Sequence, residues 1–312
     1  MSATFSGSGA RARWEAVSSD GNTYVAKFLI CATGTSFKQH VPQWEGFETY
    51  QGAVHHSSLW PGGVDLKGKR VAIIGAGSTG VQVLQEAVKV STKVVHFIRT
   101  PNIALSMRQR QISRKELYAY KPAFQHVLQA CRSTPAGLPQ INTGLKTFDI
   151  SEAKRRELWE ELWERGGFNW SIGGLADTIT DKKANRAAYD FWVEKTRPRI
   201  KNKRKRDLLV PLEPPYYLGT KQPSLEHDYY EMSDRDNVDV TASPIRRFTT
   251  AGIETDDISE DFDIVVICTG YDAVTGGLMT MNIRGANGQY LHDKWCVPTY
   301  AVNLFEEANY DE

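Results

Sequence analysis

The alternation of apolar and polar positions divides the chain into stretches of different character. Near the start, two short runs at 13–17 and 23–30 flank an Asp-Gly pair, which predicts a β-hairpin. Further along come a short buried strand at 71–74, a glycine-rich turn, a helical stretch at 81–90 and another strand at 93–99. A strand, a helix and a second strand within about 30 residues make a βαβ unit. The pattern therefore predicts an α/β fold with a parallel sheet.

Polar residues with helical periodicity fill the middle of the chain, from about 101 to 208. Four apolar side chains there are spaced to share one face of a helix: Leu158, Trp159, Leu162 and Trp163. We interpret this stretch as a helical insertion. It ends at 195–206 with eight lysines and arginines, which is typical either of a nuclear-targeting or nucleic-acid patch or of a solvated helix end. The neutral remainder of the chain favours the solvated helix end.

The final third returns to strand patterns, at 238–242, 245–249 and 262–268, with a turn at 251–252. Its last strand ends in Cys-Thr-Gly, and the second strand of the first hairpin ends in the similar Cys-Ala-Thr-Gly at 31–34. This repeat predicts two related nucleotide-binding domains. Only the second of them has a glycine-rich turn that follows a strand.

The composition of the chain limits the kinds of partner that we expect it to bind. Lysine and arginine together number 38 and the acidic residues 37, so no overall field favours a nucleic acid or a membrane surface. The four cysteines lie far apart and form no Cys-x-x-Cys pair: Cys31, Cys131, Cys268 and Cys296. This spacing argues against a metal site or a disulfide framework. The chain has neither an apolar run of about 18 residues, as a membrane span needs, nor a signal peptide. We expect a soluble, cytoplasmic protein with no metal, nucleic-acid or membrane partner.

A glycine-rich turn carries the clearest chemistry. Gly75, Gly77 and Gly80 follow a strand and open a helix with G-x-G-x-x-G spacing. The first glycine permits the tight turn, the second lets the backbone approach a pyrophosphate, and the third allows close packing of helix on strand. The helix N-terminus, with Ser78 and Thr79, offers N–H groups and a positive dipole end to phosphates. The motif predicts a dinucleotide site, and a purely structural turn is the alternative.

A second glycine motif lies near the start of the chain. Residues 7–12 fit G-x-G-x-x-A, but residues 1–5 in front of them are too short and polar a run to form the required strand. We therefore interpret residues 7–12 as a linker.

The end of the next strand indicates which dinucleotide binds. An NAD site places an acidic residue there, about 20 residues after the turn, to hold the ribose 2′-hydroxyl. This chain has Arg99 and Thr100 instead. A guanidinium beside a hydroxyl suits a 2′-phosphate. We predict NADP(H) rather than NAD(H), with an exposed strand-end arginine as the alternative.

Residues 50–61, Tyr-Gln-Gly-Ala-Val-His-His-Ser-Ser-Leu-Trp-Pro, resemble the F-x-G-x-x-x-H-x-x-x-W-P fingerprint of Baeyer–Villiger monooxygenases, which are class B flavin-dependent monooxygenases. Tyrosine replaces phenylalanine, and the other four of the five fixed positions match. Without the fingerprint, His56 would be an ordinary loop histidine and Trp60 an ordinary core aromatic. The resemblance implies that both belong to the functional site.

Other segments are similar to the same family, so that the resemblance runs from about residue 24 to 295. They are Arg99–Asn102, Gly166–Phe168, Asn185–Phe191 and Gly219–Lys221. The resemblance implies that Lys221 is a second cation at the 2′-phosphate, and two charges near one dianion give selectivity; a solvated loop lysine is the alternative. It also implies FAD as a cofactor and the NADPH- and oxygen-dependent conversion of a ketone, such as a secondary metabolite, to an ester or lactone.

Two departures from the family bear on activity. Where the family has an arginine implicated in stabilising the reacting flavin and holding the nicotinamide, this chain has Gln222, and a neutral amide cannot replace a guanidinium beside an anion. The family's flavin-binding segments also lie upstream and downstream of the matched part. We therefore expect a chain truncated at both flavin-binding ends, with the monooxygenase activity impaired or repurposed and FAD bound only with help from another subunit.

The predicted architecture is a Rossmann-like NADP-binding domain at 65–275, which contains the helical insertion. A remnant of a flavin-domain hairpin and linker at 1–64 precedes it, and a return segment of the flavin domain at 276–312 follows.

Two alternative functions remain open beside the monooxygenase. One is a flavin-less, redox-neutral cyclase or isomerase that uses the former cofactor cleft. Its candidate polar groups are His55, His56, Tyr216, Tyr217 and Gln222. The other is a non-catalytic NADP-binding protein that forms a homo-oligomer or pairs with another chain. The retained motifs argue against a defective gene product.

Overall fold

The computed structural model describes residues 1–295 except 136, 141 and 274. Its contacts form two compact units, which we describe separately. The central unit comprises Gln43–Cys268, and the terminal unit comprises Met1–Pro42 with the chain from Thr269 onward. Residues 43–64 belong to the central unit, although the sequence predicted that they form one segment with residues 1–42. Cys296 and the rest of 296–312, which is the last part of the expected return segment at 276–312, lie outside the described residues.

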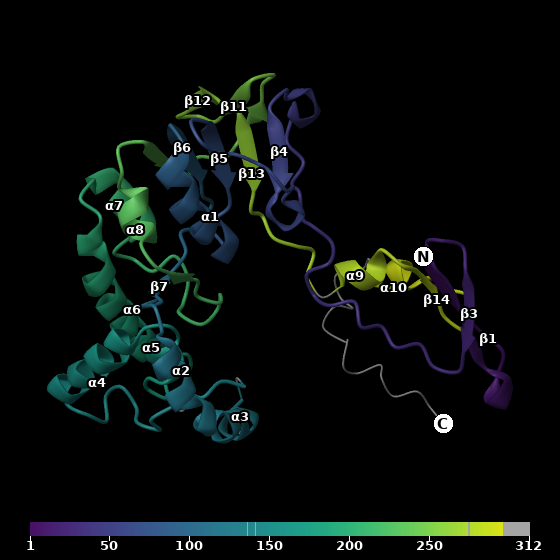
Figure 1. Ribbon diagram of the computed structural model, residues 1–312, viewed down its shortest axis with the longest axis horizontal. Coiled ribbons are helices and arrows are strands. Elements are labelled where there is room, and N and C mark those ends of the chain that lie inside the picture. Colours follow the sequence, from purple (N-terminus) through teal and green to yellow (C-terminus); the bar gives the residue numbers. More distant parts are fainter. Residues whose placement is uncertain (136, 141, 274, 296–312) are drawn as a thin grey trace. The chain divides into compact units, whose positions relative to one another are not determined.

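Five parallel strands form the sheet of the central unit, in the order β4-β13-β5-β6-β9 (Figure 1). Their bounds are β4 Ala53–His56, β5 Arg70–Ile74, β6 Lys93–Phe97, β9 Val238–Thr241 and β13 Ile264–Ile267. The predicted βαβ unit is present, because α1 (Ser78–Val90) connects β5 to β6. The strand β4 was not predicted; its sequence Ala-Val-His-His has little strand character, and its pairing with β13 defines it.

Alternate side chains of the central strands pack on opposite faces of the sheet. Val71 and Ile73 contact the core that includes α1 and the helical insertion. Ala72 and Ile74 contact a second core on the other face, with Phe248. A three-stranded antiparallel sheet supplies that second core: β10 Arg247–Phe248, β11 Gly252–Glu254 and β12 Ser259–Asp261. Because both faces are covered, β13 and the part of β5 after Arg70 are continuously apolar, as is typical of parallel sheets.

The helical insertion is confirmed and continues the first core. Its elements are β7 Leu105–Ser106, α2 Arg114–Tyr120, α3 Phe124–Arg132, α4 Glu152–Arg165, α5 Asn169–Ile172, α6 Lys182–Thr196 and α7 Lys203–Leu209, followed by β8 Leu225–Glu226 and α8 Tyr229–Ser233. Short 3-10 turns also occur: η1 Gly9–Arg11, η2 Phe47–Thr49, η3 Ser57–Leu59, η4 Lys121–Ala123 and η5 Arg197–Arg199. Trp159, Leu162 and Trp163 are buried on one face of α4, as the spacing predicts. They lie with Phe191 of α6 and Trp170 of α5 in an aromatic cluster.

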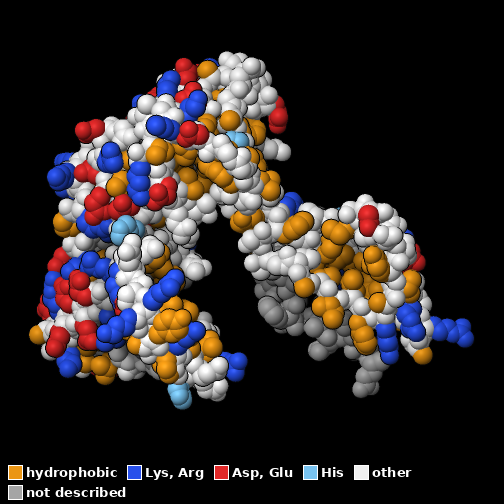
Figure 2. All heavy atoms as spheres, viewed as in Figure 1, with side chains coloured by type: hydrophobic (Ala, Val, Ile, Leu, Met, Phe, Trp, Pro, Cys, Tyr) orange, Lys and Arg blue, Asp and Glu red, His pale blue; other side chains and the backbone are white. Residues whose placement is uncertain are grey.

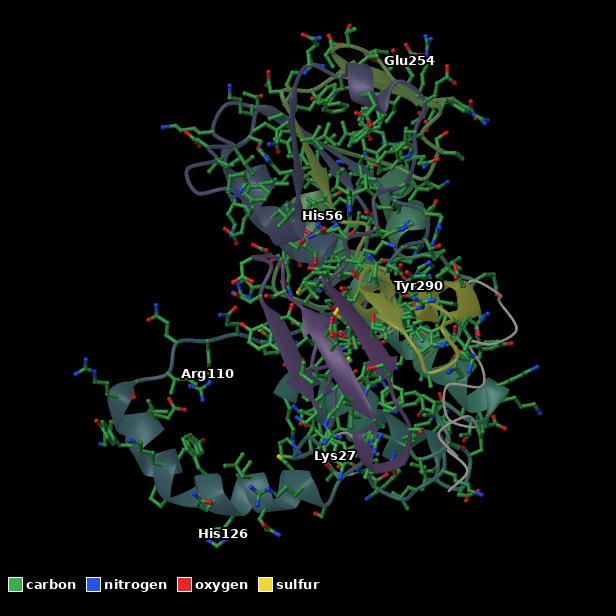
Figure 3. The ribbon with its side chains drawn as sticks, turned by 90° about the vertical axis from the view of Figure 1, so that its right-hand side faces the viewer. Lys27, His56, Arg110, His126, Glu254 and Tyr290 are labelled. Carbon is green, nitrogen blue, oxygen red and sulfur yellow. The ribbon has the colours of Figure 1, made fainter. Side chains whose placement is uncertain are left out.

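The helices α2 and α3 differ from the rest of the insertion because neither has a buried residue. They extend away from the other helices, with Arg110 just before α2 and His126 on α3 (Figure 3).

Four of the eight lysines and arginines of the basic run at 195–206 form ion pairs with acidic side chains. Lys201, Lys203 and Arg204 are exposed, so the interpretation as a solvated helix end holds for only part of the run. Lys195 lies 2.7 Å from Glu160, and Arg199 lies 2.7 Å from Glu226. Further pairs are Arg199–Glu231, Arg197–Asp207 and Arg204–Asp239. Acidic and basic side chains alternate over the surface of this region (Figure 2). These partners are distant in sequence, and they neutralise the run locally.

The terminal unit contains a four-stranded sheet in the order β14-β1-β2-β3. Its elements are β1 Ser2–Ser6, β2 Arg13–Val17, β3 Thr23–Ala26, α9 Gly276–Met279, β14 Asn282–Arg284 and α10 Leu291–Trp295. The predicted hairpin is present as β2 and β3. The expectation that residues 1–5 form no strand is wrong, because β1 pairs with both β2 and β14 and Phe5 contacts Trp14. Residues 7–12 connect β1 to β2, as a linker does.

The second predicted strand of the hairpin ends earlier than expected. β3 stops at Ala26, and Phe28 and Ile30 are 74% and 87% exposed. No strand among the described residues pairs with 27–30, so the apolar run has no ladder to join. Cys31–Gly34 therefore does not follow a strand as Cys268–Gly270 does, although Gly34 and Gly270 share a left-handed conformation.

Candidate functional site

The carboxyl ends of the parallel strands bring several predicted site residues to one edge of the sheet. The registers place His56, Ile267, Ile74 and Phe97 in one row, at the last positions of β4, β13, β5 and β6. From β5 the chain continues through α1 to β6 on one side, whereas β13 pairs on the other side. Ligands of open α/β sheets bind at such a switch point, outside the carboxyl ends of the strands.

The glycine-rich turn lies at this switch point, directly after β5. Gly75 has φ +115°, and its N–H donates to the carbonyl of Phe97 at 2.9 Å. A β-carbon on Gly80 would lie 1.9 Å from the carbonyl oxygen of Gly75, so that only glycine permits this packing of helix on turn. Gly77 has open space around its α-carbon, as a backbone that must approach a phosphate requires.

The helix α1 begins at Ser78, three residues earlier than predicted, with Gly77 as its N-cap. Gly77 has no side chain that could cap the helix, and the first helical hydrogen bond runs from the N–H of Val81 to the carbonyl of Gly77. The N–H groups of Ser78, Thr79 and Gly80 therefore have no intrahelical acceptor. Three free donors at the positive end of a 13-residue helix fit a pyrophosphate.

A buried histidine, which sequence reasoning missed, lies beside the turn. His96 is in β6, and its Nε2 lies 2.9 Å from the carbonyl oxygen of Gly75. Burial lowers the pKa of His96 to about 4, so the imidazole is neutral at physiological pH. The available signal was one polar residue in the otherwise apolar run Val94–Ile98.

Arg99 and Thr100 follow β6 directly. The N–H of Ile98 donates to the carbonyl of Thr241, which fixes the end of the strand. Beyond it Arg99 is exposed, and it makes no hydrogen bond or ion pair with the residues that the structure describes. A guanidinium that is free of protein partners is available to an anionic ligand.

Hydrogen bonds attach the loop that carries Lys221 to the segment after Arg99. The hydroxyl of Tyr216 accepts from the N–H of Ile103 at 2.9 Å, and the side chain of Asn102 accepts from the N–H of Ser224 at 3.2 Å. The exposed ammonium of Lys221 lies 4.7 Å from the ring centre of Tyr216. Both predicted cations thus lie on segments that are joined to each other.

The same loop also contacts the start of α1. The hydroxyl oxygens of Ser224 and Ser78 are 3.0 Å apart, so the 216–224 loop and the glycine-rich turn are linked. Gln222 is exposed in this loop and has no hydrogen bond to the described residues. Its neighbour Tyr217 is likewise exposed.

His56 and Trp60 lie at the end of β4. His56 is 8% exposed, and its Nδ1 accepts from the N–H of Ser58 and lies 2.8 Å from the Ser58 hydroxyl. Trp60 is 39% exposed, with its ring 5.7 Å from that of His55. Two strand spacings separate His56 from Ile74, about 10 Å. His56 is therefore at the same edge as the glycine-rich turn (Figure 3), and its role in catalysis stays a prediction.

Cys268 ends the neighbouring strand at this edge. Its N–H donates to the carbonyl of Ile74 at 2.8 Å, and burial raises the pKa of its thiol to about 12. The thiol stays protonated and is a poor nucleophile.

The second glycine motif, at 7–12, does not fit a dinucleotide. After β1 the chain passes through the 3-10 turn η1 into β2, and no α-helix follows the glycines. The rejection of this motif as a cofactor site is thus supported, although its strand exists.

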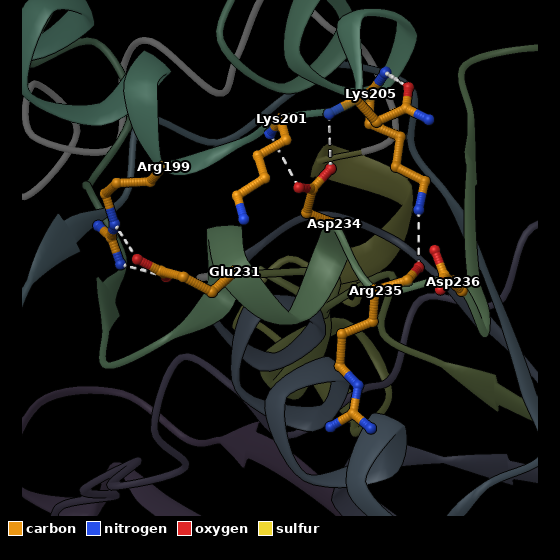
Figure 4. Close-up of a pocket in the computed structure, with 8 residues that line it drawn as sticks. Arg199, Lys201, Lys205, Glu231, Asp234, Arg235 and Asp236 are labelled. Atoms are coloured by element: carbon orange, nitrogen blue, oxygen red, sulfur yellow. Dashed lines mark hydrogen bonds and ion pairs between the residues drawn. The ribbon is translucent and has the colours of Figure 1, made fainter.

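A surface pocket lies away from the glycine-rich turn, where residues 234–236 lead into the amino end of β9. Its lining is Arg199, Lys201, Asn202, Lys205, Glu231, Asp234, Arg235 and Asp236 (Figure 4). Four basic and three acidic side chains line it, so their charges nearly balance. Arg199 pairs with Glu231, and the carboxylate of Asp234 accepts from the backbone N–H groups of Lys201 and Asn202. Across the described ranges, no three acidic, histidine or cysteine side chains are grouped to hold a metal ion.

Comparisons with known proteins agree with this geometry. Residues 2–120 match the family described as flavin-binding monooxygenase-like. The chain is 38% identical over 290 residues to the FAD-binding monooxygenase acrE of Aspergillus aculeatus, and 40% identical over 274 residues to cyclopentanone 1,2-monooxygenase of Comamonas sp.. The chain is thus similar to flavin-binding monooxygenases over most of its own length. Those two alignments cover 91% and 86% of this chain and 49% and 50% of the relatives.

Solved structures of similar proteins lead to the same family. OTEMO in complex with FAD and NADP superimposes with a TM-score of 0.89 at 31% identity, over 95% of this chain and 56% of OTEMO. Cyclohexanone monooxygenase from Rhodococcus sp. Phi1, bound to NADP+, gives a TM-score of 0.85 at 31% identity. This alignment covers 91% of this chain and 54% of the cyclohexanone monooxygenase chain. The family resemblance and the α/β fold expected from the sequence are confirmed. The chain spans about half the length of the relatives that it matches.

Proposed function

We propose that this chain binds NADP(H) at the carboxyl edge of its parallel sheet. The single observation that carries the proposal is the glycine-rich turn. There Gly80 packs closely on Gly75, and the first N–H groups of α1 have no intrahelical acceptor. In this proposal the N–H groups of Ser78, Thr79 and Gly80 hold the pyrophosphate.

Two cations support a preference for the 2′-phosphate. Arg99 is exposed and unpaired at the end of β6, and Lys221 lies on the loop that is bonded to the segment after Arg99. With Thr100 as a hydroxyl donor, these groups would bind a dianion that NAD(H) lacks.

We further propose that the chain serves a Baeyer–Villiger-type oxidation of a small ketone, in secondary metabolism and in the cytoplasm. The fingerprint His56 and Trp60 at the same sheet edge support this activity. FAD, where it is bound, would supply the oxygen chemistry. The residues of this chain would bind NADPH and orient its nicotinamide toward the flavin.

A flavin spectrum tests this activity directly. The protein, expressed with excess FAD, is purified and its visible absorbance recorded before and after addition of NADPH under nitrogen. A stoichiometric flavin band that bleaches, together with ketone-dependent NADPH consumption in air, supports the monooxygenase. A colourless protein that still binds NADPH overturns that activity for this chain and leaves the NADP(H) site intact.

Gln222 favours a second candidate, a redox-neutral enzyme that uses the same cleft. An exposed, neutral amide stands where the family resemblance implies an arginine beside the flavin, so charge stabilisation there is weakened. Turnover of a substrate in the absence of NADPH and oxygen supports this candidate, and a strict dependence on NADPH excludes it.

Exposed apolar side chains of the terminal unit favour a protein partner. Phe28, Ile30 and the edge-strand residues Tyr24 and Val25 are all more than half exposed, and apolar side chains gather on this unit (Figure 2). Such surfaces invite association with another chain or a second copy. Light scattering that shows a monomer at all concentrations, together with no binding of a dye for exposed apolar surface, would contradict this proposal.

A further inference from the structure

His96 is a buried polar side chain with one contact to the dinucleotide turn and one to Tyr229 of α8. It is fully buried in β6, between apolar neighbours of the sheet and α1. Its Nε2 lies 2.9 Å from the Gly75 carbonyl oxygen, and its Nδ1 lies 3.5 Å from the hydroxyl of Tyr229. The β-carbon that Gly80 lacks would come within 3.5 Å of the same Nε2. His96 thus occupies the point where the turn, α1 and α8 meet.

The two contacts determine the tautomer of the imidazole. A carbonyl oxygen can only accept a hydrogen bond, so Nε2 carries the proton and donates it to Gly75. Nδ1 is then the acceptor and faces the donor hydroxyl of Tyr229. No charged side chain contributes to the pKa of His96, which agrees with a neutral ring that serves as a hydrogen-bond donor.

Tyr229, which contacts His96, belongs to a larger buried network. The N–H of Tyr229 donates to the carboxylate of Glu226, which is fully buried and paired with Arg199 through both oxygens. Tyr229 is fully buried, so its ring has little freedom to move. The orientation of His96 is therefore held from the side opposite the turn.

We propose that His96 is a positioning residue for NADP(H), which holds the Gly75 carbonyl and thereby orients the free N–H groups of the turn toward the pyrophosphate. The inference rests on the proposed NADP(H) site. A glycine-rich turn has many accessible backbone conformations, and a fixed carbonyl reduces the cost of ordering it when the ligand binds.

Three variants test this role. His96→Leu has similar size and no donor, His96→Gln keeps an N–H at about the position of Nε2, and Val95→Ala weakens the same strand from its other face without contact to the turn. For each, the dissociation constant for NADPH is measured by calorimetry and the unfolding midpoint by circular dichroism. If His96→Leu does not fold, His96→Asn, whose amide is too short to reach Gly75, takes its place.

We expect His96→Leu to weaken NADPH binding about tenfold, His96→Gln to bind within about threefold of the unchanged chain, and Val95→Ala to bind normally despite lower stability. Unchanged affinity in His96→Leu, or an equal loss in Val95→Ala, overturns the positioning role and leaves the proposed site standing. Absence of NADPH binding to the unchanged chain overturns the proposed site, and the inference with it.

Discussion

The carbonyl oxygen of Gly75 lies where a β-carbon on Gly80 would come within 1.9 Å. The residues are five positions apart, one at the end of β5 and one in the first turn of α1. This approach brings the helix N-terminus close to the strand end, and it distinguishes a dinucleotide turn from an ordinary strand-to-helix connection.

Substitutions of Gly80 and Gly77 test two different properties of the turn, the packing of the helix on the strand end and the approach of the ligand. Gly80→Ala forces a methyl group into a backbone oxygen, so we expect a loss of about 3 kcal/mol in the free energy of unfolding and no NADPH binding. Gly77→Ala meets no atom within 4 Å and should fold normally, while its methyl group impedes the pyrophosphate. Chemical denaturation and NADPH titration check both. Normal NADPH affinity in Gly77→Ala would argue against the phosphate site.

The two proposed 2′-phosphate ligands should affect NADPH and NADH differently. Arg99→Ala and Lys221→Ala each remove a cation that no protein group uses as an ion-pair partner, so we expect NADPH affinity to fall about tenfold and NADH affinity to stay unchanged. Titrations with both nucleotides measure this. Arg132→Ala changes the net charge equally from the exposed end of α3 and serves as the control. Equal losses for NADPH and NADH would contradict the assignment.

The buried histidine predicts a pH dependence of stability. The pKa of His96 is about 4 in the folded chain and about 6.5 when unfolded, so the unfolded state binds more protons between these values. Stability is therefore complete above pH 6.5 and falls by about 3 kcal/mol as the pH decreases through 4. Tyr229 faces the ring, and Glu226 lies beyond it. His96→Gln, which does not titrate, should show a shallower decline in denaturant titrations, and identical profiles would contradict the burial of a neutral imidazole.

The pair Glu226–Arg199 should matter more than the pair Glu231–Arg199. The Glu226 side chain is fully buried and that of Glu231 is 47% exposed, although both bond to the same guanidinium. Glu226→Ala leaves a desolvated cation with one partner, and we expect a loss of about 3 kcal/mol in the free energy of unfolding. Glu231→Ala should cost under about 1 kcal/mol. Urea denaturation of both variants measures these free energies of unfolding. Equal losses in the two variants would contradict a structural role specific to Glu226.

Local patterns predicted those parts of the fold that depend on neighbouring residues. The strand β5, the helix α1 and the glycine-rich turn follow from the apolar run and glycine spacing at 71–90. The strand β4 did not follow, because it is defined by β13, a partner far along the chain. The strand β1 did not follow because its sequence is short and polar, although it pairs with the neighbouring β2 as well as with β14. Likewise, the basic run could not be matched with acidic residues such as Asp239 before the fold was known.

The candidate site was predictable to a similar extent. Glycine spacing and the strand-end Arg99 indicated the cofactor from the sequence alone, whereas Lys221 and His56 depended on family resemblance. His96 was missed because its function lies in a contact to a backbone carbonyl, which no sequence motif encodes.

The central claim, an NADP(H) site at the glycine-rich turn, is tested most directly by the dissociation constants of NADPH and NADH measured side by side on the unchanged chain. Two cations near the 2′-phosphate predict saturable, equimolar binding of NADPH, with an affinity about a hundredfold higher than for NADH. Equal affinities would contradict the roles of Arg99 and Lys221. No binding of either nucleotide would contradict the site itself.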